Sequence, residues 1–165
     1  MNEPSQTYIL SEISQTIAFG AIIGALLLPT DLILLSGGLG AGKTHLTKGI
    51  IAGMGSSDVV TSPTYIFINE YRLAARGVAF HVDLYRVEDA RELASIGLDD
   101  ALMGHGACII EWPERDPMLM TMPHLAMTLA VQSDNTRLVT IHSRGPRAAA
   151  LMAEINARWQ NGAHA

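Results

Sequence analysis

The sequence is organised around residues 32–44, which read LILLSGGLGAGKT. An apolar, strand-forming run ends there in the pattern Gly-x-x-x-x-Gly-Lys-Thr, from Gly37 to Thr44, and a helix-forming segment follows. Glycines allow consecutive backbone N–H groups to turn toward a phosphate, and the start of a helix adds its positive dipole end. Because a strand before and a helix after are the context that this motif requires, the segment predicts a phosphate-binding P-loop.

The loop itself supplies the predicted nucleotide contacts. Lys43 is expected to reach the β- and γ-phosphates, and the hydroxyl of Thr44 is expected to bind the Mg²⁺ ion that carries the rest of the phosphate charge. The residues expected to line the bound nucleotide are Gly38, Leu39, Gly40, Ala41, Gly42, Lys43, Thr44 and His45.

Length and composition indicate the kind of domain that contains the loop. With 165 residues, 48% of them hydrophobic and 16% charged, the chain is expected to form a single P-loop domain over residues 1–165. The formal net charge of −5 is unlike the broad basic surface that dominates affinity for nucleic acids. We therefore expect any connection with RNA to run through a partner.

The remaining compositional signals favour a reducing cytoplasm. Cys108 is the only cysteine, cannot form an internal disulfide, and is expected in the core. No Lys or Arg precedes Lys43, which argues against a conventional signal peptide, and the apolar run 17–28 is too short for a membrane span. Gly20 and Gly24 in that run are expected to allow close packing of a soluble helix.

Hydrophobic periodicity predicts an α/β fold of three layers, with a mixed, mainly parallel sheet and antiparallel hairpins. Two hairpins are expected, one between the strands at 66–71 and 78–83 and one between those at 125–131 and 137–142. Other strands are expected at 8–10, 31–36 and 107–112, and helices between Ser11 and Pro29, at 43–54, 88–96 and 99–103, and from Pro146 onward.

Two acids stand where predicted strands end. Asp83 and Glu111 should meet at the carboxyl edge of the sheet, where ligands of open α/β folds bind. Hydrolysis would need one acid at the metal and one group that orients the attacking water. The sequence leaves open which of Asp83 and Glu111 binds the metal and which orients the water. Thr64, on a loop stiffened by Pro63, is a candidate switch hydroxyl that senses the γ-phosphate, or else a residue that merely starts a strand.

Several other polar residues have two readings. His81 shares a strand face with Asp83, but a lone histidine is more often a core or hydrogen-bonded residue than a catalyst. Arg72 and Arg76 could act as the lid arginines of a small kinase, or simply be solvated in a hairpin turn. Trp112 is expected to serve in packing or in contact with a partner.

The motifs taken together resemble the TsaE (YjeE) family. The resemblance covers residues 11–113 well and the C-terminal hairpin and helix loosely. It rests on the P-loop and on four further segments in the same order and spacing: Ser62-Pro63-Thr64-Tyr65, His81-x-Asp83-Leu84-Tyr85-Arg86, the stretch from Glu92-Leu93 to Gly97-Leu98, and Ile110-Glu111-Trp112-Pro113.

This resemblance implies an Mg²⁺-dependent ATPase that binds ATP and ADP and works with the proteins TsaD and TsaB. Together they form threonylcarbamoyladenosine beside the tRNA anticodon, and the transfer itself belongs to TsaD. The family pattern implies that Lys43 holds the phosphates, that Thr44 and Glu111 lie at Mg²⁺, and that Asp83 and Thr64 lie by the water and the γ-phosphate. Hydrolysis by the chain alone is expected to be slow.

Two positions depart from the family pattern. Gly38 stands where the family usually has Asp, and His45 where it usually has Thr or Ser. The first change puts in doubt a role for a loop acid and could loosen the loop. Two other functions compete with this one. A small-molecule kinase needs an acceptor pocket and a lid, and the usual Asn-Lys-x-Asp motif of a GTPase switch has no match in the sequence.

Overall fold

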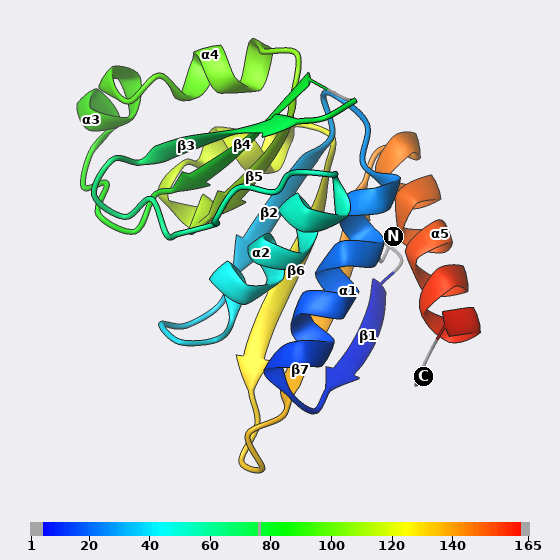
Figure 1. The fold of residues 1–165 in the computed structure, drawn as a ribbon. Coiled ribbons are helices and arrows are strands. Elements are labelled where there is room, and N and C mark those ends of the chain that lie inside the picture. Colours follow the sequence, from blue (N-terminus) through cyan, green and yellow to red (C-terminus); the bar gives the residue numbers. More distant parts are fainter. Residues whose placement is uncertain (1–4, 76, 163–165) are drawn as a thin grey trace.

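A computed structural model describes residues 5–75 and 77–162 (Figure 1). Its seven-stranded sheet has the order β1-β7-β6-β2-β5-β4-β3. The elements are β1 Ser5–Leu10, α1 Ile13–Leu26, β2 Leu32–Ser36, α2 Lys43–Gly53, β3 Ile68–Leu73, β4 Gly77–Asp83, α3 Ala90–Ser95, α4 Leu98–Met103, β5 Ala107–Glu111, the 3₁₀ turns η1 Pro113–Arg115 and η2 Pro117–Thr121, β6 His124–Val131, β7 Arg137–Arg144 and α5 Pro146–Gly162.

The sheet is parallel in its centre and antiparallel at its edges. β2 pairs in parallel with both β5 and β6, and β5 pairs in parallel with β4. The edge strands are added by the two predicted hairpins, β3–β4 and β6–β7, and by β1, which pairs antiparallel with β7. The expected mixed sheet of an α/β fold is confirmed, with its parallel pairs confined to the centre.

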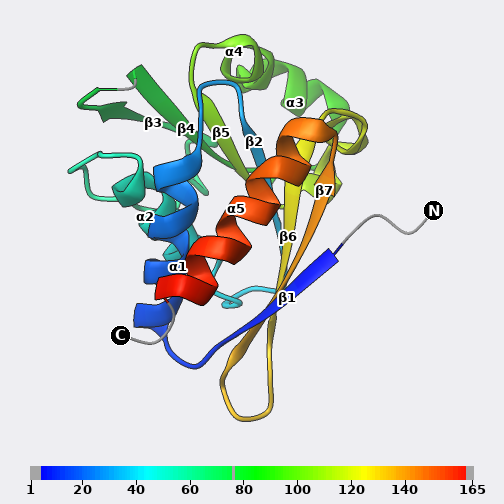
Figure 2. The same ribbon diagram turned by 90° about the vertical axis from the view of Figure 1, so that its right-hand side faces the viewer.

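Alternate residues of β2 show why the fold has three layers. Ile33 and Leu35 join one core cluster with residues of α1, α2 and α5, which cover the same face of the sheet (Figures 1 and 2). Leu32 and Leu34 join a second cluster with residues of α4 and η2 on the opposite face. A strand that is buried on both faces needs apolar residues along its buried length, as β2 has from Leu32 to Leu35.

Glycines set the P-loop helix tightly against its neighbour. A Cβ atom on Gly20 or Gly24 of α1 would collide with the backbone oxygen of Leu46 or Ile50 in α2. Gly49 of α2 faces the backbone of α1 in the same way. The close helix packing expected for Gly20 and Gly24 is thus confirmed. Within residues 5–75 and 77–162, no helix has the length and hydropathy needed to cross a bilayer.

α3 and β3 begin clearly later than periodicity predicts. α3 begins at Ala90 because the carboxylate of Asp89 accepts hydrogen bonds from the backbone N–H groups of Arg91 and Glu92, which makes Asp89 the N-cap. β3 begins at Ile68 because Phe67 adopts a left-handed backbone conformation with φ of 63°. The loop before β3 is therefore longer than expected, and it reaches the carboxyl end of β4.

Candidate functional site

The P-loop connects β2 to α2 with a backbone that glycine makes possible. Gly37 and Gly42 have φ angles of 143° and 105°, and a Cβ atom on Gly37 would collide with the backbone oxygen of Leu129 in β6. Gly38 differs, since its φ is not positive and no atom lies within 4 Å of the place where its Cβ would stand. The geometry therefore requires glycine at position 37 and permits a side chain at position 38.

Lys43 opens α2 and points back into the loop. Its ammonium donates hydrogen bonds to the backbone oxygens of Gly37 and Gly38, at 2.7 and 2.9 Å, and lies 4.3 Å from the centre of the Trp112 ring. Burial lowers the pKa of this ammonium, and the negative charges of Glu111, Asp83 and Glu114 oppose that effect. The ammonium of Lys43 is therefore held at the P-loop by backbone oxygens and lies near acids that favour its charged form.

The two strand-end acids lie side by side, but they have different partners. Asp83 and Glu111 are register partners in the parallel pair β4–β5, and both are buried. The hydroxyl of Thr44 donates a 3.3 Å hydrogen bond to Glu111 Oε1. Of the two acids, Glu111 is therefore the one that is hydrogen-bonded to Thr44.

Asp83 instead receives the loop that precedes β3. Its Oδ2 accepts hydrogen bonds from Ser62 Oγ at 3.0 Å and from Thr64 Oγ1 at 2.9 Å, and the two hydroxyls lie 2.6 Å apart. Its Oδ1 accepts a hydrogen bond from the backbone N–H of Tyr85 at 2.9 Å. The candidate switch hydroxyl of Thr64 is therefore docked on the acid at the end of β4.

These groups surround one cavity of about 280 Å³ at the carboxyl ends of β2, β4 and β5. Among the described residues no group of three or more His, Cys, Asp or Glu could hold a metal by itself. A donor set of one hydroxyl and one or two carboxylates still fits Mg²⁺, which takes most of its ligands from phosphates and water. The residues that line the cavity are Leu39, Gly40, Ala41, Gly42, Lys43, Thr44, His45, Ser62, Thr64, Asp83, Tyr85, Glu111, Trp112 and Arg137.

Four of the lining residues were not predicted as site residues: Ser62, Tyr85, Trp112 and Arg137. Tyr85 and Trp112 each follow closely after a strand-end acid, and their ring centres lie 5.0 Å apart. That position after the acids is a signal that sequence reasoning could have used. Nothing local marks Arg137, because it reaches the cavity from the β6–β7 hairpin.

His81 and the arginines with two readings can now be placed. His81 is fully buried, and its Nε2 lies 2.8 Å from Glu111 Oε1, so it is a core residue that is also hydrogen-bonded. Arg72 is exposed on β3 and does not line the cavity, which gives the lid reading no support. Arg76 lies outside the described residues.

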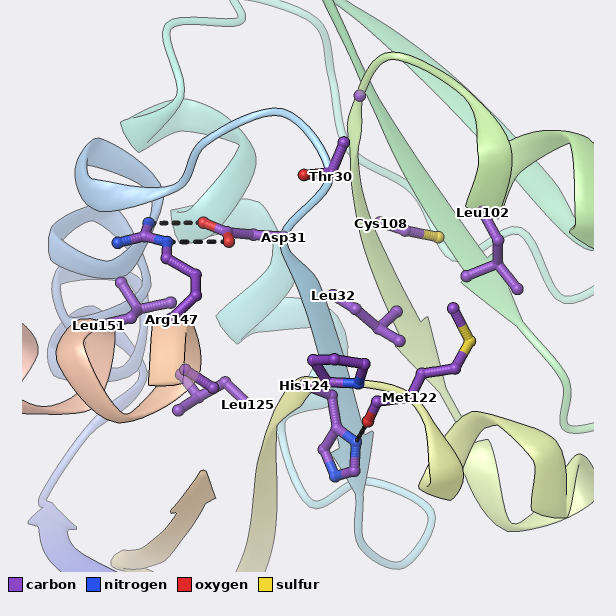
Figure 3. Close-up of a pocket in the computed structure, with 13 residues that line it drawn as sticks. Thr30, Asp31, Leu32, Leu102, Cys108, Met122, His124, Leu125, Arg147 and Leu151 are labelled. Carbon is purple, nitrogen blue, oxygen red and sulfur yellow. Dashed lines mark hydrogen bonds and ion pairs between the residues drawn. The ribbon is translucent and has the colours of Figure 1, made fainter. Parts of the chain in front are cut away.

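A second cavity, of about 380 Å³, lies at the opposite ends of β2 and β5 (Figure 3). On one wall the Arg147 guanidinium clamps the Asp31 carboxylate, with Nε–Oδ1 and Nη2–Oδ2 distances of 3.0 and 2.6 Å. On another wall lies Cys108, where burial raises the pKa of the thiol to about 12. Although larger, this cavity has mostly apolar walls and a neutralised ion pair, so it lacks the chemistry of a phosphate site.

The family model and the similar proteins that match this chain carry the same description. The family model of the threonylcarbamoyl adenosine biosynthesis protein TsaE matches residues 10–139. A Bacillus subtilis protein described as tRNA threonylcarbamoyladenosine biosynthesis protein TsaE is 34% identical over 142 residues, covering 86% of this chain and 88% of that protein. A Treponema pallidum protein of the same description is 32% identical over 126 residues, covering 76% and 92%.

The fold has a solved counterpart. The crystal structure of Bacillus subtilis YdiB matches with a TM-score of 0.80 and 27% sequence identity, covering 96% of this chain and 98% of that one. A match over nearly the whole of both chains supports the P-loop NTPase fold that the motif and the sheet indicate.

Proposed function

The chain belongs to the TsaE family of threonylcarbamoyl adenosine biosynthesis proteins, and from this membership we propose that it is an Mg²⁺-dependent ATPase that acts as a switch. Its role is to drive repeated formation of N6-threonylcarbamoyladenosine next to the tRNA anticodon, in the cytoplasm. The partners are TsaD, which carries out the transfer, and TsaB. The tRNA is contacted through that complex, in keeping with a net charge of −5.

The phosphates of ATP are held by the P-loop. Lys43 already presents its ammonium to loop oxygens 2.7 and 2.9 Å away, and phosphate oxygens would replace these carbonyls as stronger, charged acceptors. The N-terminus of α2 directs its first N–H groups toward the same anion. Binding of a nucleotide is thus supported by a charge and a helix dipole that converge on one point.

Thr44 and Glu111 would hold Mg²⁺. The Thr44 hydroxyl and the Glu111 carboxylate lie beside the loop, joined by a 3.3 Å hydrogen bond, and a hard cation prefers oxygen ligands of these kinds. The bound ion supplies positive charge to the β- and γ-phosphate oxygens. Asp83, the register partner of Glu111 on β4, would accept a hydrogen bond from the attacking water and orient it toward the γ-phosphate.

The loop around Ser62 and Thr64 provides the switch. Thr64 donates to Asp83 in this structure, and a γ-phosphate oxygen would compete for the same hydroxyl. Hydrolysis would return Thr64 to Asp83, so the loop would have two arrangements set by the nucleotide. The ATP state would then control affinity for TsaD and TsaB, because only differential contacts with a partner can shift such an equilibrium.

One observation carries this proposal: a P-loop lysine and threonine, a strand-end acid and a hydroxyl-bearing loop line one cavity. The test is a reconstituted assay with purified TsaD, TsaB and tRNA. We expect slow phosphate release by the chain alone, faster release with the TsaD–TsaB pair, and repeated modification of tRNA only when ATP is present. Failure to bind the pair with ATP, together with no gain in multi-turnover modification, would contradict the switch.

The same assay separates the switch from a small-molecule kinase. A kinase transfers the γ-phosphoryl group to an acceptor, so phosphorylated small molecules would accumulate in place of free phosphate. Phosphate that is released only in the presence of the partners favours the switch.

A further inference from the structure

His81 lies in the middle of β4 in a position that core packing alone does not explain. Its side chain is completely buried, and it is flanked in the sheet by Asn69 of β3 and Ile109 of β5. The ring of Tyr71 stacks beside it at 6.5 Å between ring centres. Along β4 it precedes Asp83 by two residues, so both side chains point to the same face of the sheet.

The hydrogen bonding of His81 is one-sided. A carboxylate only accepts, so His81 Nε2 carries the hydrogen and donates it to Glu111 Oε1 over 2.8 Å. The other ring nitrogen, Nδ1, is buried and has no hydrogen-bond partner among the described residues. A buried polar atom without a partner is unfavourable, and an apolar side chain of similar size would avoid it. The contact that a histidine makes here and an apolar side chain could not make is the one from Nε2 to Glu111.

The effect of that contact falls on one oxygen of Glu111. Oε1 accepts both hydrogen bonds, from His81 and, at 3.3 Å, from Thr44. Oε2 receives none from the described residues, and Glu111 lines the cavity. A carboxylate held by one oxygen has a defined orientation and leaves its second oxygen available to a ligand.

We propose that His81 is a positioning residue, which fixes the Glu111 carboxylate beside Thr44 and so presents Oε2 to a divalent cation. The inference rests on the proposed function, since it gives His81 a role at the Mg²⁺ site that this function requires. Residues that orient a ligating carboxylate by hydrogen bonding contribute strongly to metal affinity in general. Here the restraint is built into the sheet, because His81 and Glu111 lie on adjacent strands.

The test compares three variants of the full chain. His81→Leu removes the donor, and His81→Gln keeps an N–H group that can reach Glu111. His124→Leu is the matched control, because His124 is also a buried histidine on a strand, bonded through Nδ1 to the backbone oxygen of Met122. Each variant is titrated with Mg²⁺ in the presence of a fluorescent ADP analogue, and nucleotide affinity is measured separately in EDTA.

We expect His81→Leu to raise the Mg²⁺ concentration at half-saturation by about 10- to 100-fold and to leave the affinity in EDTA unchanged. His81→Gln should recover most of the loss, and His124→Leu should behave like the wild type. A His81→Leu protein with a Mg²⁺ response within twofold of wild type would overturn the positioning role, as would an equal loss in His124→Leu.

A ligand-free measurement keeps the inference separate from the proposed function. In ¹⁵N NMR of the imidazole groups, His81 should be the Nε2–H tautomer, and Glu111→Gln should change its shifts. If the wild type shows no response to nucleotide or Mg²⁺, the proposed function is lost and the metal role of His81 with it. If the wild type responds but the His81 shifts ignore Glu111→Gln, only the positioning inference is overturned.

Discussion

Thr64 Oγ1 donates a 2.9 Å hydrogen bond to Asp83 Oδ2, and this contact ties the loop before β3 to the end of β4. The two residues are nineteen positions apart in the chain. A hydroxyl that donates to a carboxylate in the protein and could instead donate to a γ-phosphate is a simple two-state element.

Thr64→Ala tests that element. The variant loses the contacts of the Thr64 hydroxyl with Asp83 and with Ser62, and a hydrogen bond is worth roughly 1 kcal/mol. Ser62 still bonds to Asp83. We expect ATP binding within a few-fold of wild type and a loss of repeated tRNA modification in the reconstituted assay. Thr61→Ala is the control, because Thr61 lies exposed in the same loop. Equal effects of the two variants would contradict the switch role.

Lys43→Ala should weaken ATP binding strongly. Charge-assisted hydrogen bonds contribute about 1.5–3 kcal/mol each, so losing the ammonium should cost roughly 100-fold or more in affinity. Titration of a fluorescent ATP analogue measures the effect. Lys48→Ala removes an exposed lysine from the same helix and should bind normally. A folded Lys43→Ala protein with unchanged affinity would refute the P-loop assignment.

The two acids should be separable by their metal dependence. Glu111→Gln should weaken the Mg²⁺ enhancement of ADP binding by at least about tenfold, since Glu111 is the acid hydrogen-bonded to Thr44. Thr44→Val should act in the same direction, because it removes an oxygen ligand. Asp83→Asn should retain Mg²⁺-dependent binding and lose hydrolysis. If Asp83→Asn loses the metal response and Glu111→Gln keeps it, the roles are reversed.

Replacing Gly37 or Gly38 of the P-loop by alanine should have different effects on the free energy of unfolding. Gly37→Ala combines a φ of 143° with a collision at the backbone of Leu129, and we expect a loss of about 1–3 kcal/mol in the free energy of unfolding. Gly38→Ala meets open space and should be neutral or slightly stabilising, because it restricts the unfolded chain. Urea unfolding of both variants measures these changes in the free energy of unfolding. A larger loss for Gly38→Ala would show that the loop has another conformation.

The thiol of Cys108 should react only when the protein unfolds. Burial raises its pKa to about 12, so at pH 8 roughly one thiol in ten thousand is the reactive thiolate, before the lack of access is counted. We expect labelling by an aromatic disulfide reagent to follow the urea unfolding curve. Rapid labelling of the native protein would indicate opening of the cavity shown in Figure 3.

Sequence reasoning works well here for features that are local in the chain. The P-loop is contiguous, and its spacing alone demands a strand before it and a helix after it. Asp83 and Glu111 could be predicted as neighbours because parallel strands of one sheet end at a common edge, and their pairing in register agrees. The starts of α3 and β3 are displaced from the predicted ones, because a capping side chain and a left-handed residue act on single positions.

Amino-acid order therefore determined the P-loop, its flanking strand and helix, and the two acids, since hydrophobic period and motif spacing act over a few residues. Only the folded sheet brought Arg137 to the P-loop, Thr64 to Asp83 and His81 to Glu111. Such contacts depend on strand order, on register and on which way each side chain points. These are set by the packing of the whole core, so no local pattern reveals them.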